Sequence, residues 1–177
     1  MSILLVVIIM YFLNCFFIYS ILGYFLEMIF GYLMGFRAES GVLYGPWTPI
    51  YGFASIMIIV LSSSCFKNLH LPRWIETIIV FVLLTILISL LEFIGGYLIE
   101  FIFGFSFWDY SNRPFHLGKY VCFEFSLLWG ILSVIFIYIL NPFVNRIINK
   151  IPKWMTIMFY ILLFVDFFYR IFVEFKQ

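Results

Sequence analysis

Long apolar runs, separated by short polar connectors, dominate the chain. A helix needs about 20 largely apolar residues to cross the hydrocarbon core of a bilayer. Runs that approach or exceed this length occur at roughly 3–30, 48–66, 75–103, 122–140 and 154–174. The alternation typical of membrane β-strands is absent, and an open sheet cannot satisfy its backbone in lipid. The pattern therefore predicts an all-α integral membrane protein with about five transmembrane helices.

The connectors carry the helix-breaking residues. All six prolines fall in or beside connectors, where a missing backbone N–H costs least. The first and third runs are longer than a minimal span, so we expect those helices to tilt or to project beyond the lipid. We expect residues 1–177 to form a single transmembrane domain.

Composition narrows the class of protein further. The chain is 66% hydrophobic and 11% charged, with a mean hydropathy of +1.15, whereas soluble domains carry about 25% charged residues. The formal net charge of +1 and the lack of a basic stripe argue against a nucleic-acid partner. The three cysteines are far apart and form no CxxC spacing, which argues against a disulfide framework or a zinc site, and we expect no cofactor.

The N-terminus and the basic residues of the connectors bear on membrane topology. The N-terminal "MSILLVV" has no basic region and no cleavage motif follows it, so we expect the first run to be a retained span. Lysine and arginine are slightly more numerous in the connectors on the N-terminal side, five against four. By the positive-inside rule, this asymmetry predicts a multi-pass protein of the cell membrane with a cytoplasmic N-terminus.

Two stretches of the chain resemble each other, "GYFLEMIFG" at 23–31 and "GYLIEFIFG" at 96–104. Their alignment places Glu27 over Glu100, and the runs that follow carry "IYG" at 50–52 and "LWG" at 128–130. This predicts a parallel repeat of two helix pairs, about 3–66 and 75–140, plus a fifth helix at about 154–174. Short matches also arise by chance, because membrane helices draw on few residue types. Some transporters are built from parallel repeats, with their sites near the repeat interface.

Charged residues inside the predicted spans are the main candidates for a functional site, because a charge at bilayer depth is costly and normally faces protein or water. They fall toward the side opposite the N-terminus and predict a polar cavity that forms a substrate or ion pathway, lined by Glu27, Glu92, Glu100, Glu124, Asp166 and Arg170. Glu92 lies about 12 Å deeper than Glu100, at ~1.5 Å per residue. In the alternative interpretation, Glu27 and Glu100 extend to the interface, while Asp166 and Arg170, four residues apart, neutralise each other.

The stretch 105–120, "FSFWDYSNRPFHLGKY", concentrates polar side chains in an otherwise apolar chain. Together with the connector between the first two runs, it is predicted to form a gate over the cavity, made of Arg37, Trp47, Trp108, Asp109, Tyr110, Ser111, Arg113 and His116. A catalytic alternative would combine Asp109, Ser111 and His116, but no GxSxG elbow frames the serine. We therefore assign no catalytic residue and no metal ligand.

Three blocks of sequence resemble a known family: "FIYSILGYFLE" (17–27), "LYGPWTPIYG" (43–52) and the stretch 90–130, which includes "WDYSNRPF". They are similar to the CmpB-like family of type IV ABC transporters, found in bacteria such as Firmicutes, over about residues 12–145. The GP-x-x-PIYG and WDYS motifs are the specific ones. Tyr24 stands where the family often has Trp, Glu124 lies where the family is commonly less acidic, and a basic run before the second block is reduced to Arg37.

The resemblance implies a permease-type membrane subunit. The chain contains no GxxxxGK[ST] phosphate-binding loop, so transport would need a separate ATPase subunit. Five spans are few for a translocator, so we expect a homodimer surrounded by membrane lipids. Two alternatives stay open: an accessory or assembly protein of another membrane complex, and a membrane-embedded lipid-modifying enzyme.

Overall fold

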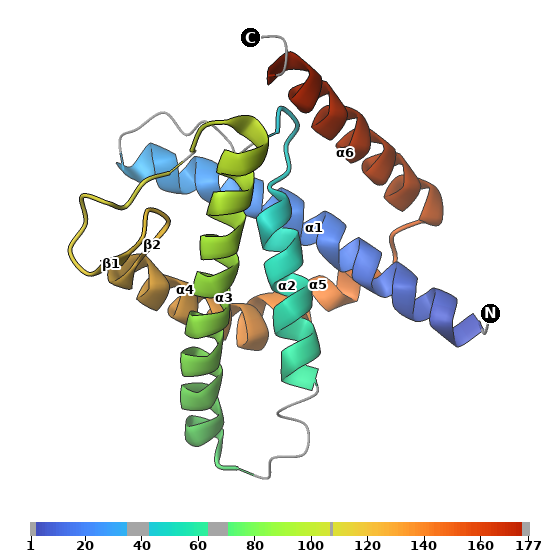
Figure 1. Ribbon diagram of the computed structural model, residues 1–177. Helices are drawn as coiled ribbons and strands as arrows, with labels where there is room; N and C mark the ends of the chain where they lie inside the picture. The colour runs from blue at the N-terminus through green and yellow to red at the C-terminus, as the bar shows by residue number, and fades with distance from the viewer. Residues whose placement is uncertain (1–2, 35–42, 64–70, 107, 175–177) are drawn as a thin grey trace. The chain divides into compact units, whose positions relative to one another are not determined.

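The computed structural model describes residues 3–34, 43–63, 71–106 and 108–174. Arg37, which the sequence assigned to the gate, lies outside these residues. The elements follow one another (Figure 1) as α1 (Ile3–Met34), α2 (Pro49–Leu61), α3 (Arg73–Phe103), β1 (His116–Leu117), β2 (Val121–Cys122), α4 (Phe123–Ile135), a π-helical turn (Phe136–Leu140), α5 (Asn141–Ile148) and α6 (Lys153–Glu174).

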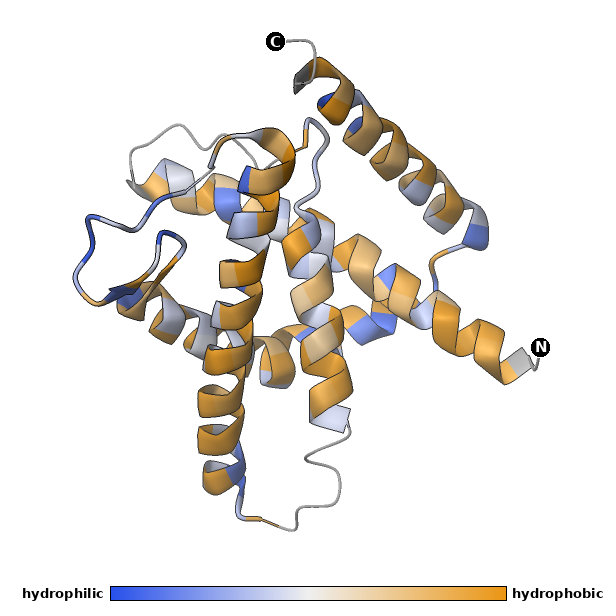
Figure 2. Ribbon diagram, viewed as in Figure 1, coloured by the Kyte–Doolittle hydropathy of each residue, from blue (hydrophilic) through white to orange (hydrophobic). Residues whose placement is uncertain are grey.

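Most of the described chain is apolar helix. Among the described residues, four helices are long and apolar enough to cross a membrane, namely Leu4–Leu33, Arg73–Phe103, Phe123–Ile148 and Lys153–Val173. Figure 2 shows hydrophobic residues along these helices and hydrophilic ones in the segment that leads into the β1–β2 hairpin. The predicted all-α membrane fold is confirmed. Within the described residues, however, the second predicted span corresponds to a shorter apolar helix, α2.

The fourth helix is longer than the sequence predicted. It continues through α5 to Ile148, whereas the apolar run ended at residue 140 and Pro142 was assigned to a connector. A proline inside a helix removes one hydrogen bond and crowds the carbonyl four residues earlier. Here that carbonyl belongs to Tyr138, which lies within the π-helical turn Phe136–Leu140. The wider turn accommodates Pro142 and lets the helix continue.

The chain packs as two compact units, which we describe separately. Unit 1 contains Met1–Ile56 and Asn145–Gln177, and unit 2 contains Met57–Val144. Unit 1 is therefore built from both ends of the chain, and unit 2 from its middle.

The core of unit 1 is aromatic. Phe159 of α6 lies against Phe17 of α1, with ring centroids 4.3 Å apart, and against Trp47, at 5.6 Å. Phe16 and Leu43 complete this buried cluster. The segment that precedes α2 is therefore fixed between the first and last helices by burial of large rings, which contribute most per residue to an apolar core.

A polar contact near the middle of α1 adds to this core. The Asn14 amide donates to the Ile148 carbonyl at 3.3 Å, and its Oδ1 accepts from the Thr156 hydroxyl at 2.5 Å. The Tyr160 hydroxyl donates to the Leu13 carbonyl at 3.1 Å. Asn14 and Thr156 are both buried, so these bonds satisfy groups that lipid could not.

Unit 2 is organised around a stripe on α3. Five of the six buried residues of this helix recur at every fourth position, namely Val80, Leu84, Ile88, Glu92 and Gly96. The buried residues of α4 are all small, namely Ser126, Gly130 and Ser133. Small residues let two helix backbones approach closely, a common means of helix packing in membranes.

A short hairpin precedes α4. β1 and β2 pair antiparallel, with His116 opposite Cys122 and Leu117 opposite Val121. Gly118 opens the turn with a φ of 63°, a left-handed conformation that glycine adopts without a steric penalty. The Tyr110 amide donates to the Lys119 carbonyl at 2.8 Å, which connects the hairpin turn to the preceding loop.

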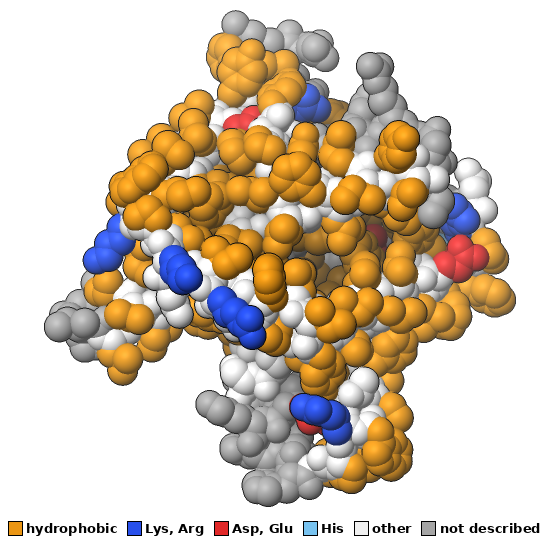
Figure 3. All heavy atoms as spheres, turned by 180° about the vertical axis from the view of Figure 1, so that it is seen from behind, with side chains coloured by type: hydrophobic (Ala, Val, Ile, Leu, Met, Phe, Trp, Pro, Cys, Tyr) orange, Lys and Arg blue, Asp and Glu red, His pale blue; other side chains and the backbone are white. Residues whose placement is uncertain are grey.

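The described surface is largely apolar, as expected for helices surrounded by lipid. Figure 3 shows hydrophobic side chains over most of the visible face, with a small number of basic and acidic side chains among them. The exposed apolar side chains include Phe101 of α3 and Phe168 of α6, which are 87% and 62% exposed. Such side chains would not be stable in contact with water over whole helices.

Candidate functional site

Glu92 is a buried carboxylate on the stripe of α3, with 6% of the residue exposed. It accepts a hydrogen bond from Nε1 of Trp129 in α4 at 3.1 Å. The Tyr110 hydroxyl is a second partner. Burial and the nearby Glu92 carboxylate raise the pKa of Tyr110, so this hydroxyl keeps its proton at neutral pH. The described partners of Glu92 are therefore neutral N–H and O–H groups.

Glu100, two turns further along α3, has a different environment. Its carboxylate accepts hydrogen bonds from the Lys119 ammonium and from the Tyr120 hydroxyl, both at 2.5 Å. The bond to Glu100 raises the pKa of Lys119, so the pair stays charged well above neutral pH. Gly96 lies under the Tyr120 ring, and a Cβ at Gly96 would overlap that ring. Glu100 thus fixes the hairpin turn onto α3.

Glu27 is the corresponding acidic residue of α1. The Thr48 hydroxyl donates to it at 3.4 Å, and the Tyr51 hydroxyl is a further partner. Gly23, one turn earlier, lies under the Tyr51 ring in the way that Gly96 lies under Tyr120. Like Glu92, Glu27 is held by neutral donors, in this case from the start of α2 and the residue before it.

Asp166 of α6 binds the segment that precedes α2, in addition to any interaction with Arg170 on its own helix. It accepts from the Tyr44 amide at 3.2 Å, the Gly45 amide at 2.8 Å and Trp47 Nε1 at 2.9 Å. Arg170 donates to the Tyr44 hydroxyl at 2.9 Å, and its guanidinium lies 5.0 Å from the centre of that ring. Asp166 and Arg170 of α6 therefore bind the same loop of unit 1.

Glu124 lies at the surface of unit 2. It faces Arg113 at 3.5 Å, and the two side chains are 54% and 55% exposed. Exposed ion pairs of this kind contribute only about 0–1 kcal/mol. The sequence placed Glu124 beside the other carboxylates, but nothing in its surroundings resembles the enclosure of Glu92.

The other predicted gate residues of unit 2 shape the hairpin loop. Trp108 Nε1 donates to the Tyr120 carbonyl at 3.2 Å. The Ser111 amide donates to Asp109 Oδ1 at 2.8 Å, which forms a local turn. His116 Nδ1 lies 2.8 Å from the Gly118 carbonyl. These contacts hold the loop in one conformation.

Asp109 gives the loop a pH-dependent turn. The hydrogen bonds from the Ser111 hydroxyl and amide lower the pKa of Asp109, so the ionised form stabilises the turn. This stability is present above the ordinary aspartate pKa and is lost as the pH falls through the lowered value. We expect the Ser111 amide to stay protected from hydrogen exchange until the pH lies below about 3.8, the ordinary value.

Two substitutions separate this turn from general acid unfolding. Asp109→Asn keeps a carbonyl acceptor and should show no acid transition at Ser111, whereas Asp109→Ala should lose protection at every pH. Exchange measured by mass spectrometry on the purified protein in detergent distinguishes the three cases. Equal Ser111 protection in wild type and Asp109→Ala would show that this turn does not depend on the carboxylate.

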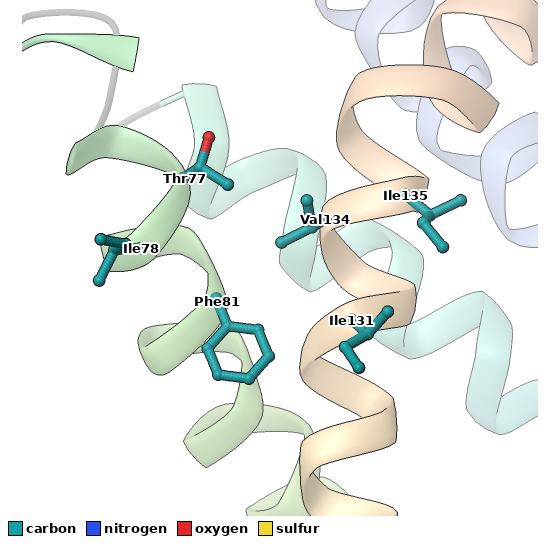
Figure 4. A pocket seen from close by; sticks show the side chains of 6 residues that line it. All are labelled: Thr77, Ile78, Phe81, Ile131, Val134 and Ile135. Atoms are coloured by element: carbon teal, nitrogen blue, oxygen red, sulfur yellow. The ribbon is translucent and has the colours of Figure 1, made fainter. Parts of the chain in front are cut away.

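A pocket of about 310 Å³ lies between α3 and α4. Figure 4 shows its lining side chains, which are apolar apart from one threonine: Thr77, Ile78, Phe81, Ile131, Val134 and Ile135. A second pocket, of about 320 Å³, is lined by Arg73, Thr77 and Tyr138. Neither pocket has a carboxylate in its lining. The polar cavity inferred from the sequence therefore stays a prediction.

The catalytic alternative gains no support from the described geometry. Ser111 bonds Asp109, while the described hydrogen bond of His116 is to the Gly118 carbonyl, so no bond that joins His116 to Ser111 or to Asp109 is described. Among the described residues, no group of three or more His, Cys, Asp and Glu side chains could hold a metal ion.

Sequence reasoning found the carboxylates but missed most of their partners. Thr48, Tyr51, Lys119, Tyr120 and Trp129 each bond one of them. One signal was available, because "IYG" and "LWG" both place an aromatic residue with a polar hydrogen before a glycine. In both cases that aromatic residue is a partner of a glutamate in the preceding long helix.

The long apolar helices with enclosed carboxylates define a multi-pass α-helical membrane protein. The chain belongs to the family described as "Putative ABC-transporter type IV", which matches residues 14–175. The match confirms the resemblance and extends beyond it to include α6. Comparison with curated proteins and with solved structures gives no match.

Proposed function

We propose that this chain is the permease subunit of a transporter in the cell membrane, with the N-terminus in the cytoplasm. The family supports a membrane protein related to transport. The observation that supports the permease role is the burial of Glu92. This residue is 6% exposed and lies in a helix that is long and apolar enough to cross a membrane. A carboxylate at that depth is costly, and such residues commonly mark substrate or ion pathways.

The candidate pathway residues are Glu27, Asp166 and Arg170 within unit 1, and Glu92, Glu100 and Glu124 within unit 2. Ser20 supports a polar path in unit 1, because its hydroxyl is buried without a described hydrogen-bond partner. The loops that contain Trp47 and residues 108–116 act as the gate. A separate ATPase subunit supplies the energy, and a homodimer in lipid provides enough helices for a passage.

The test is transport with a variant that preserves the fold. Gln has a side-chain carbonyl that still accepts from Trp129, so Glu92→Gln should fold normally yet lose transport. Intracellular small solutes, measured by mass spectrometry in cells with and without the chain, should differ for wild type and not for this variant. An ATPase should co-purify with both forms.

Glu76→Gln is the matched control, since Glu76 lies in the first turn of α3, away from the other carboxylates. It should behave as wild type. The permease role fails if Glu92→Gln shifts the same solutes to the same extent, or if the chain changes no solute with an ATPase present.

One observation favours an accessory or assembly role as the second candidate. The hairpin displays large apolar side chains outside the long helices, with Phe115 85% and Leu117 66% exposed. Phe115 is held at a φ of 54°, which is uncommon for a residue with a bulky side chain. A partner-binding role predicts that Phe115→Ser abolishes capture of a membrane partner while Glu92→Gln does not.

A further inference from the structure

We propose that the helix pairs α1–α2 and α3–α4 are diverged copies in which Glu27 and Glu92 are equivalent residues, and that both side chains bind and release protons. The inference rests on the proposed function only where it assigns this binding and release of protons to a transport pathway. The equivalence itself rests on contacts within each unit.

In unit 1, a glycine of α2 packs on α1. A Cβ at Gly52 would lie 2.5 Å from the Ser20 hydroxyl and 2.7 Å from the Phe16 ring, so only glycine permits this approach. Tyr51, the residue before that glycine, bonds Glu27. The glutamate lies two turns beyond Ser20 on α1.

Unit 2 repeats this arrangement with different side chains. A Cβ at Gly130 would overlap the Thr85 hydroxyl and lie 2.7 Å from the Phe81 ring. Trp129, the residue before that glycine, bonds Glu92 at 3.1 Å. The glutamate again lies two turns beyond the hydroxyl residue, on α3.

The spacing is the same in both copies. The long helix reads Phe-x3-Ser/Thr-x6-Glu in each, as "FFIYSILGYFLE" at 16–27 and "FVLLTILISLLE" at 81–92. The next helix reads Ser/Thr-x2-Tyr/Trp-Gly-x2-Ser in each, as "TPIYGFAS" at 48–55 and "SLLWGILS" at 126–133. The final serines, Ser55 and Ser133, are both buried and both donate to a backbone carbonyl of their own helix. Matching contacts and matching spacing in two helices support duplication with this register.

This register differs from the alignment of "GYFLEMIFG" (23–31) with "GYLIEFIFG" (96–104), which places Glu27 over Glu100. That alignment has its own support, because Gly23 and Gly96 both lie under a tyrosine ring. However, the tyrosine over Gly96 belongs to the hairpin turn, and Glu100 is paired with Lys119. Glu100 is therefore better explained as an anchor of the hairpin than as the counterpart of Glu27.

The partners of the two glutamates explain why a proton is the expected ligand. The ion pairs of the described residues join Lys119 to Glu100 and Arg113 to Glu124. The described partners of Glu27 and Glu92 are neutral, and the titratable ones that face them are Tyr51 and Tyr110. Neutral donors offset only part of the cost of an ionised carboxylate in apolar surroundings. Taking up one proton converts the carboxylate to the neutral acid, which removes that cost.

Labelling with dicyclohexylcarbodiimide tests the proposal without measuring transport. This apolar reagent reacts with protonated carboxyl groups: the acid O–H adds across a C=N bond, and the O-acylisourea rearranges to a stable N-acylurea with no atom lost. We expect the purified protein in detergent to be modified at Glu27 and Glu92, as mapped by peptide mass spectrometry. Glu27→Gln and Glu92→Gln should each lose label at the changed position only, since Gln keeps an acceptor for the neighbouring donors.

Glu100 serves as the internal control, since its ion pair should keep it ionised and unlabelled. Label at both Glu27 and Glu92, absent from Glu100, supports the proposal. Label at one of the two, at neither, or at Glu100 to the same extent overturns it. Labelled protein that transports nothing would reject the permease role alone, and Glu92-dependent transport without label would reject this inference alone.

Discussion

Asp166→Ala should lower the free energy of unfolding by about 2–4 kcal/mol. Asp166 accepts from the Gly45 amide and Trp47 Nε1 in partly buried surroundings, and from the more exposed Tyr44 amide. Each buried donor left without an acceptor costs about 1–3 kcal/mol. Unfolding by increasing SDS in mixed micelles, followed by circular dichroism, measures the change.

Two variants serve as controls for this prediction. Asp166→Asn keeps one carbonyl oxygen and should lose less stability than the alanine variant. Asp109→Ala removes a carboxylate that bonds only its own exposed turn and should leave global unfolding nearly unchanged. If Asp166→Ala unfolds with the wild-type midpoint, the carboxylate does not anchor the segment before α2.

Gly96→Val should displace the hairpin turn from α3 and destabilise unit 2 by about 1–3 kcal/mol, the usual cost of overpacking. An added Cβ would lie 2.8 Å from the Tyr120 Cβ, which is close to the backbone and cannot swing away as the end of a side chain would. Displacement also breaks the 2.5 Å bond from the Tyr120 hydroxyl to Glu100. Cys122, fully buried in wild type, should then react with a thiol reagent.

A double substitution distinguishes steric overlap from a general helix effect. Tyr120→Ala removes the two closest overlaps, with ring atoms at 2.3 and 2.5 Å, and leaves only the 2.8 Å overlap with Cβ. The combined variant should therefore lose less stability than the two single changes added together. Tyr120→Phe keeps the ring but removes the bond to Glu100, and so measures that bond alone. Full protection of Cys122 in Gly96→Val would contradict the packing described for the hairpin.

The sequence predicted the long helices well, because burial in lipid requires a long apolar run and little else. It was wrong about the extent of the fourth helix. Pro142 usually ends a helix, and the single-turn change to π-helical geometry at Phe136–Leu140 has no reliable sequence signal. The second predicted span corresponds to the apolar helix α2, which is described over Pro49–Leu61.

The carboxylates could be predicted and their partners largely could not. Glu92 stands out in the sequence as a charge deep inside a long apolar run, and the structure places it on the buried stripe of α3. Asp166 shows the opposite case. Local spacing suggested Arg170 as its partner, but the described bonds of Asp166 are to Tyr44, Gly45 and Trp47, more than 100 residues earlier. Only tertiary packing brings such segments together, and one sequence does not record it.

The discontinuous composition of unit 1 has a consequence for biosynthesis. Ribosomes add about 5–20 residues per second, and domains generally fold in the order in which they emerge. Residues 57–144, which form unit 2, are made in full before α6 exists. Asn14 must therefore wait on the order of 10 seconds for Thr156 to be synthesised. During that interval the polar Asn14 side chain of the first helix lacks its final partner. We therefore expect the membrane insertion machinery to bind nascent α1 until α6 has been made.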